Sequence, residues 1–176
     1  MPGNNRPMAG QGDPAHMAWI CAGSNIGDGR AHCDAGFTAI ENGGYGVIDA
    51  RSPYYMTEPV DYREQDWFVN GVVRIRTDLA PLDLLAGLKA IEAAAGRRTG
   101  GIRFGPRILD LDIILYDDRV YSSPTLEIPH VRMHERRFVL KPLCDIDPTV
   151  VHPGFDVTVA TLFDRLGSAD QRVVPC

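Results

Sequence analysis

The chain has 176 residues, 44% of them hydrophobic and 23% charged, with a formal net charge of −5. Its length allows a buried core without disulfides, and its acidic charge argues against general binding of nucleic acids or anionic membranes. No window approaches the roughly 20 apolar residues of a membrane span. Four scattered cysteines and the absence of a secretory signal predict a reduced, cytoplasmic protein without membrane partners.

The elements can be predicted in chain order from hydrophobic periodicity and turn residues. Residues 1–16 are rich in Gly, Pro and Asn, which predicts a disordered tail before a single domain over 17–176. Strands are expected over 17–23, 46–56, 68–77 and 108–116, the last with a hairpin partner over 117–121. Helices are expected from Asp28 to Asn42 and over 78–95, followed by a short helical turn within 128–143 and a helix near 157–167.

Local signals support several of these elements. Asp28 is placed to cap the first helix, Pro81 lies in the first turn of the second, and Gly96 follows the end of the second. The strand over 68–77 alternates apolar and polar side chains, which predicts one core face and one polar face. The order of the elements favours an α+β fold of ferredoxin-like type, a mostly antiparallel sheet with helices packed on it.

Two carboxylates, Asp110 and Asp112, interrupt the apolar strand over 108–116. Residues i and i+2 of a strand point to the same face, so the two carboxylates repel each other unless cations hold them. The opposite face is expected to be core, formed by Leu109, Leu111, Ile113 and Leu115. The flanking residues on the carboxylate face are Ile108, Ile114 and Tyr116. Mg²⁺ suits such a pair, and salt bridges to arginines on an exposed face are the alternative.

A basic, glycine-rich loop precedes these carboxylates. Its arginines are Arg97, Arg98, Arg103 and Arg107. Arginine forks match phosphate oxygens, and glycines let a polyphosphate approach the backbone, so the segment predicts a nucleotide phosphate site rather than a solvated basic turn. The chain has neither the GxxxxGK[ST] nor the GxGxxG motif, which excludes a P-loop site and a dinucleotide fingerprint.

The stretch RFGPRILDLDIIL over 103–115 resembles the signature of the 6-hydroxymethyl-7,8-dihydropterin pyrophosphokinases. The resemblance extends from about residue 17 to 166, through CAGSN, YMTEPV, DWFVNGVV and IPHVRMHERRFVLKPL. The chain departs from the family pattern at Glu58, Thr99 and Val131. The resemblance implies transfer of pyrophosphate from ATP to the pterin hydroxymethyl group in folate biosynthesis, by a monomer whose partners are these small molecules.

The resemblance also implies roles for individual residues. Asp110 and Asp112 would hold two Mg²⁺ ions that bridge the ATP phosphates. Residues implied to contact ATP or its transferring phosphates are Arg97, Arg103, Arg107, His130 and Arg136, with Arg98 as the alternative to Arg97 and with Glu92 and Ile113 also meeting the nucleotide. Residues implied to form the pterin pocket are Thr57, Val60, Phe68, Asn70, Phe104 and Phe138. Phe68 and Asn70 are i and i+2 on one strand face, so together they can frame a flat ligand that forms hydrogen bonds.

Alternatives remain open from the sequence. Phe68 and Phe138 can be ordinary core residues, and His130 a loop histidine. A ferredoxin-like module that binds nucleotide or pterin without catalysis would show the same motifs. A palm-type nucleotidyltransferase would need a third carboxylate and a polynucleotide site, against which the acidic charge counts.

Overall fold

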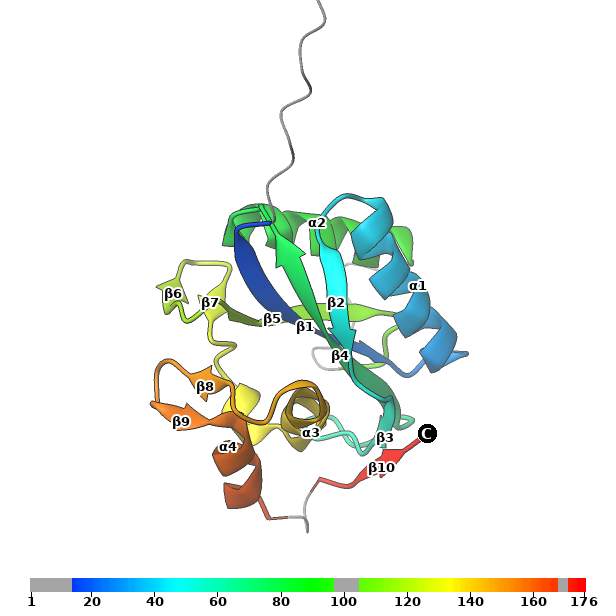
Figure 1. The fold of residues 1–176 in the computed structure, drawn as a ribbon. Helices are drawn as coiled ribbons and strands as arrows, with labels where there is room; N and C mark the ends of the chain where they lie inside the picture. Colours follow the sequence, from blue (N-terminus) through cyan, green and yellow to red (C-terminus); the bar gives the residue numbers. More distant parts are fainter. Residues whose placement is uncertain (1–13, 97–104, 168–170) are drawn as a thin grey trace, which may run out of the picture.

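The fold was obtained as a computed structural model that describes residues 14–96, 105–167 and 171–176. Within these ranges one sheet has six strands, and every strand pair in it is antiparallel. Its order is β10-β3-β4-β1-β5, with β2 also paired to β4 (Figure 1). The strands are β1 (His16–Ser24), β2 (Val47–Arg51), β3 (Tyr55–Thr57), β4 (Phe68–Thr77), β5 (Asp110–Tyr116) and β10 (Val173–Pro175).

Helices cover both faces of this sheet. On one face, α1 (Gly29–Asn42) and α2 (Pro81–Ala94) bury apolar side chains against β1, β4 and β5. On the other face lie the short helix η1 (Met133–Glu135), α3 (Arg137–Ile146) and α4 (Val159–Arg165). Two small hairpins stand apart from the sheet, β6 (Tyr121–Ser122) with β7 (Glu127–Ile128) and β8 (Val151–His152) with β9 (Val157–Thr158). The predicted α+β fold is confirmed.

The first two helices follow the predicted local signals. Asp28 caps α1, because its Oδ1 accepts a hydrogen bond from the Ala31 N–H at 3.0 Å. Pro81 opens α2, where its missing N–H costs no helical hydrogen bond, and Gly96 follows the helix with a φ of +97°. The buried faces of both helices pack on the same side of the sheet, opposite to the side that α3 and α4 cover.

Strand β4 has a core on both faces, so the predicted polar face is wrong for its first half. Asn70 is only 4% exposed and Val72 only 1% exposed on that face. Helix α3 packs over them and contributes Val139, Leu140 and Leu143 to a second core. On that face, Phe68 at the start of the strand and Arg74 and Arg76 toward its end keep partial access to solvent. The covering helix lies some 70 residues later in the chain, beyond the reach of a local pattern.

A β-bulge in β5 changes which side chains share a face. Ile113 pairs with Ile20 and Leu115 with Trp19, so Ile114 is an extra residue on the β5 strand. Leu115 therefore joins the α3 core rather than that of Leu109, Leu111 and Ile113, and Tyr116 joins the α1–α2 core. The predicted sides of Leu115 and Tyr116 are wrong for this reason, whereas Ile114 lies on the carboxylate face as predicted.

Other expected boundaries also shift. The strand expected over 46–56 is split into β2 and β3 at Ser52–Tyr54, where Pro53 has no N–H to donate. The hairpin partner of β5 is not formed by 117–121, because β6 pairs with β7 instead. Helix α3 is longer than the expected helical turn, His16 already belongs to β1, and β10 was not predicted. Within the described segments, no helix is long and apolar enough to cross a membrane.

Candidate active site

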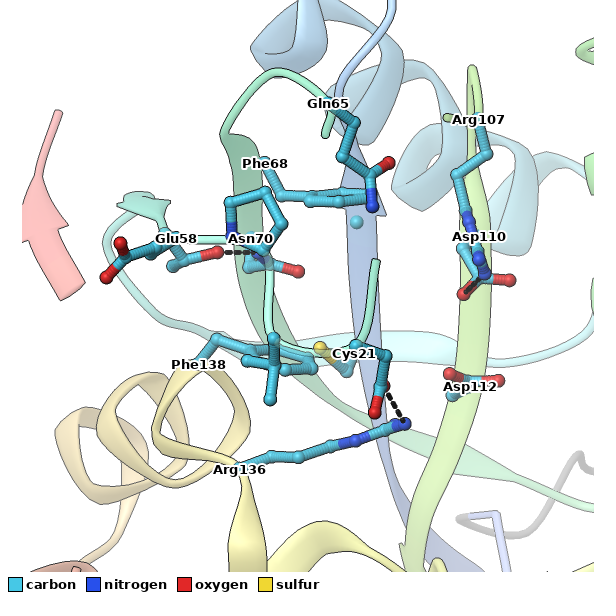
Figure 2. Close-up of a pocket in the computed structure, with 15 residues that line it drawn as sticks. Cys21, Glu58, Gln65, Phe68, Asn70, Arg107, Asp110, Asp112, Arg136 and Phe138 are labelled. Atoms are coloured by element: carbon cyan, nitrogen blue, oxygen red, sulfur yellow. Dashed lines mark hydrogen bonds and ion pairs between the residues drawn. The ribbon is translucent and has the colours of Figure 1, made fainter. Parts of the chain in front are cut away.

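A pocket opens on the α3 side of the sheet (Figure 2). Its floor is formed where β1 runs between β4 and β5, so that Gly23 pairs with Asn70 on one side and with Asp110 on the other. A Cβ atom at Gly23 would lie 2.8 Å from Asn70 Oδ1, which means that glycine is needed here to keep the floor open. The pocket is lined by Cys21, Gly23, Thr57, Glu58, Pro59, Val60, Asp61, Gln65, Phe68, Asn70, Arg107, Asp110, Asp112, Arg136 and Phe138.

The two carboxylates of β5 form one wall of the pocket. Asp110 Oδ2 accepts a short hydrogen bond from Arg107 Nη1 at 2.6 Å. Burial, and then the charge of Asp110, raise the pKa of the Asp112 carboxyl to about 7. A carboxyl with this pKa is half protonated near neutrality, so Asp112 would gain from a cation that restores its charge.

These carboxylates fit a divalent metal of the magnesium type. Among the described residues, no group of three or more His, Cys, Asp and Glu side chains could form a complete protein cage. Mg²⁺ does not need one, since it binds through one or two carboxylates and completes its shell with water and substrate phosphates. Asp110 and Asp112 face an open pocket where such oxygens have room.

Arg136 supplies positive charge at one edge of the pocket, below Phe138 in Figure 2. The side chain is buried, and in the described part of the chain no acceptor lies within hydrogen-bond distance of its Nε. Burial, and then the nearby charge of Arg132, lower the pKa of its guanidinium. Because this guanidinium borders the pocket, its positive charge can attract an anion there.

His130 stands close to this charge but is itself neutral. Its backbone N–H donates to Ile114 O at 2.9 Å, and its Nδ1 accepts from the Arg132 N–H at 3.1 Å. Burial, and then the charge of Arg136, lower the pKa of the ring to about 4. Because Nδ1 accepts a hydrogen bond, the proton of the neutral ring lies on Nε2, which is therefore a donor.

The other half of the pocket is a slot between two aromatic rings. Figure 2 shows Phe68 of β4 and Phe138 of α3 on opposite sides of the space in front of Asn70. Asn70 Nδ2 donates to Thr57 Oγ1 at 2.6 Å, which fixes the orientation of the amide. Two rings and an oriented amide can hold a flat heteroaromatic ligand by stacking and by hydrogen bonds to its edge.

Asn25 connects the two halves. Its Nδ2 donates to Gln65 Oε1 and to Asp66 O, both at 3.0 Å, and its Oδ1 accepts from the Arg107 N–H at 2.9 Å. The Asn25 N–H also donates to Arg107 O at 3.1 Å. One buried amide therefore ties the segment before Phe68 to the segment that carries Arg107.

Comparison with known proteins identifies the family. The sequence model of the 7,8-dihydro-6-hydroxymethylpterin-pyrophosphokinase (HPPK) family matches residues 19–148. The chain belongs to the HPPK family. It is 42% identical over 135 residues to the 2-amino-4-hydroxy-6-hydroxymethyldihydropteridine pyrophosphokinase of Pseudomonas aeruginosa, covering 77% of this chain and 83% of that protein. The protein of the same name from Bacillus subtilis is 39% identical over 131 residues, with 74% and 78% covered.

Longer proteins contain a region similar to this HPPK chain. The folic acid synthesis protein fol1 of Schizosaccharomyces pombe is 40% identical over 158 residues, which are 89% of this chain and only 21% of that protein. A crystal structure of HPPK-DHPS in complex with substrates shares the fold, with a TM-score of 0.68 at 17% identity over 86% of this chain. This chain spans 43% of that structure.

The structure brings most of the predicted HPPK site residues together. Those that line the pocket are Thr57, Val60, Phe68, Asn70, Arg107, Asp110, Asp112, Arg136 and Phe138, and His130 lies within electrostatic reach of Asp110 and Arg136. Arg97, Arg98, Arg103, Phe104 and Thr99 lie outside the described residues. Their roles stay predictions.

Glu92 and Ile113 lie elsewhere. Glu92 is buried between α2 and β5, where its Oε1 accepts from the Leu111 N–H at 2.7 Å and from Lys89 Nζ at 2.8 Å. Ile113 is part of the α1–α2 core, on the face of β5 opposite to the two carboxylates. Neither side chain lines the pocket, so their predicted contact with a nucleotide is not tested.

Several pocket residues were not predicted from the sequence. Among them, Asp61 and Gln65 sit in the polar loop before Phe68, and Cys21 pairs with Asp112 across β1 and β5. For Asn25, the only sequence signal of a role at the site was its place in the CAGSN motif. Of the departures from the family pattern, Glu58 lines the pocket and pairs with Arg172 at 3.5 Å, whereas Val131 is 59% exposed.

Proposed function

We propose that this protein transfers the pyrophosphoryl group of ATP to the hydroxymethyl oxygen of 6-hydroxymethyl-7,8-dihydropterin, which yields the pterin diphosphate and AMP in folate biosynthesis. The observation that carries the proposal is one pocket in which the carboxylate pair Asp110 and Asp112 borders the slot of Phe68, Asn70 and Phe138. Membership of the HPPK family supports the same reaction.

The slot would bind the pterin. Phe68 and Phe138 would stack on the two faces of its flat bicyclic ring, and Asn70 would form hydrogen bonds to its polar edge. Because Thr57 Oγ1 holds the Asn70 amide from behind, the amide is already oriented before the ligand arrives. The hydroxymethyl group would then lie toward the β5 wall, where the phosphates are expected.

The arginines and carboxylates would bind MgATP. Asp110 and Asp112 would hold the metal ions, which would neutralise phosphate charge and orient the phosphate oxygens. Arg107 would leave Asp110 to the metal and offer its guanidinium to the phosphates, and the guanidinium of Arg136, which borders the pocket, would bind a phosphate oxygen. His130 Nε2–H would donate a further hydrogen bond to the nucleotide.

In the proposed step the pterin hydroxyl oxygen attacks the β-phosphorus while the bond from that phosphorus to the α–β bridging oxygen breaks. The bond electrons leave with AMP, the hydroxyl proton passes to water, and the arginines stabilise the charge that moves onto the bridging oxygen. His130 is too weak a base to accept the hydroxyl proton at pH 7, because its pKa lies near 4. Catalysis would therefore rest on alignment and charge neutralisation.

Release of AMP from ATP tests this proposal. We expect AMP only when the pterin and Mg²⁺ are both present, and we expect its loss in the double variant Asp110→Ala, Asp112→Ala with its circular dichroism spectrum retained. A well-folded wild-type protein that binds both ligands and makes no AMP would instead be a binding module. We further propose that the enzyme is cytoplasmic and acts as a monomer. Sedimentation at assay concentrations would check the monomeric state.

A further inference from the structure

One carboxylate of the pocket, that of Asp61, is bound by an arginine that has no role in the proposed reaction. Asp61, in the segment that follows β3, accepts two hydrogen bonds from Arg132: Nη2 to Oδ1 at 2.9 Å and Nη1 to Oδ2 at 3.1 Å. The two residues are 71 positions apart in the chain. Such a two-point fork fixes both distance and orientation, unlike a single-point surface ion pair.

The same carboxylate lies near the proposed phosphate site. Asp61 Oδ2, which Arg132 holds, is also 3.8 Å from Arg136 Nη2. Arg136 Nη2 is already within ion-pair distance of Asp61, so the opposite charges would draw this carboxylate closer if Arg132 did not hold it. An Asp61 that paired closely with Arg136 would occupy its guanidinium and place a negative charge where phosphate oxygens are expected to bind.

We propose that Arg132 is a positioning residue of the reaction: by binding Asp61 through both oxygens it keeps this carboxylate from approaching Arg136 more closely than 3.8 Å, and it anchors residues 58–65 as a wall of the pterin slot. The inference rests on the proposed function. Arg132 itself does not line the pocket, whereas Asp61 and Arg136 do.

The position of Arg132 suits this role. Arg132 lies directly before η1, and its backbone N–H donates to His130 Nδ1, so one residue contacts both Asp61 and His130. Its guanidinium Nε is 3.5 Å from Glu135 Oε2, which further restricts the arginine. A side-chain truncation removes the contact with Asp61 and leaves the backbone bond to His130 in place.

Separate binding measurements for the two ligands test the proposal in Arg132→Ala, Asp61→Asn and the double variant. The probes are a non-hydrolysable Mg²⁺–ATP analogue, titrated by calorimetry, and 6-hydroxymethylpterin, titrated by fluorescence. For the nucleotide analogue, we expect Arg132→Ala to raise Kd about three- to tenfold, because Asp61 then turns to Arg136. Asp61→Asn and the double variant should both stay within about twofold of wild type, because no carboxylate competes.

For the pterin probe the pattern should differ. Each single variant breaks the same anchor, so both should raise Kd by a similar factor, and the double variant should be no weaker than either. Arg132→Lys keeps the charge without the fork, and we expect its two Kd values to lie between those of wild type and Arg132→Ala. Arg119→Ala is the matched control, because Arg119 also pairs with an aspartate, Asp117, but outside the pocket.

Two results would overturn the inference. An Arg132→Ala protein with wild-type nucleotide affinity would show that Asp61 does not compete for Arg136. A double variant as weak as Arg132→Ala would show that Arg132 contacts the nucleotide itself. Failure of the proposed function is distinguishable, since wild-type protein would then bind neither probe or release no AMP.

Discussion

Replacing Asp112 with asparagine should stabilise the metal-free protein and abolish the proposed pyrophosphoryl transfer. The ionised Asp112 carboxylate is disfavoured in the folded state, because burial and Asp110 raise its pKa from 3.8 to about 7. A tenfold change in the protonation equilibrium corresponds to about 1.4 kcal/mol, so this pKa shift sets an upper limit of roughly 4 kcal/mol on the destabilisation of the folded state by the ionised carboxylate. Asp112 is half-buried and borders an open pocket, so water screens part of the cost, and we expect a gain of about 1–3 kcal/mol.

The dependence on pH follows from the sign of this shift. The cost of ionising Asp112 in the folded protein is fully present above pH 7 and disappears as the pH falls toward the ordinary pKa of 3.8. The stability difference between Asp112→Asn and wild type should therefore be largest at pH 8 and fall to about a third of that value at pH 5.

Urea unfolding in EDTA at pH 8 and pH 5 measures this difference in the free energy of unfolding. Asp118→Asn, at an exposed aspartate just after β5, is the control and should change stability at neither pH. With Mg²⁺ and ATP analogue present, the order should reverse, because wild type alone would gain binding energy. If Asp112→Asn were no more stable than wild type in EDTA at pH 8, other groups of the metal-free protein would already stabilise the ionised Asp112 carboxylate. The expected cost of ionising Asp112 would then be refuted.

Further variants test other parts of the site. Gly23→Ala places a Cβ atom 2.8 Å from Asn70 Oδ1, so it should raise the Kd for 6-hydroxymethylpterin about tenfold or more. The Kd for the nucleotide analogue should change little. Equal losses of affinity for both ligands would contradict a local effect. Asn25→Ala removes the side-chain contacts to Gln65, Asp66 and Arg107 and should cost about 1–3 kcal/mol in urea unfolding, together with a lower kcat. Glu92 accepts a hydrogen bond from the backbone of β5 outside the pocket, so Glu92→Gln should lower the free energy of unfolding by about 1–2 kcal/mol and leave pterin affinity unchanged. A selective loss of nucleotide affinity without a loss of stability would instead indicate that Glu92 contacts the nucleotide directly.

Much of the site was predictable because its pattern is local. Asp110 and Asp112 share a face of β5, and Phe68 and Asn70 share a face of β4, as the period of two in a strand requires. The caps of α1 and the proline at the start of α2 are also signals written within a few residues. The family motifs added Arg136 and Phe138, whose place no periodicity would have indicated.

Only the tertiary structure decided which distant segments meet. Helix α3 turned the expected polar face of β4 into a second core, and the bulge at Ile114 moved Leu115 to that core. Asn25 joins the two halves of the pocket, and the fork between Asp61 and Arg132 joins residues 71 positions apart. Hydrophobic periodicity and helix caps are set by residues a few positions apart in the chain. The contacts named here depend instead on how complete helices and strands pack, and a local sequence pattern holds no information about that packing.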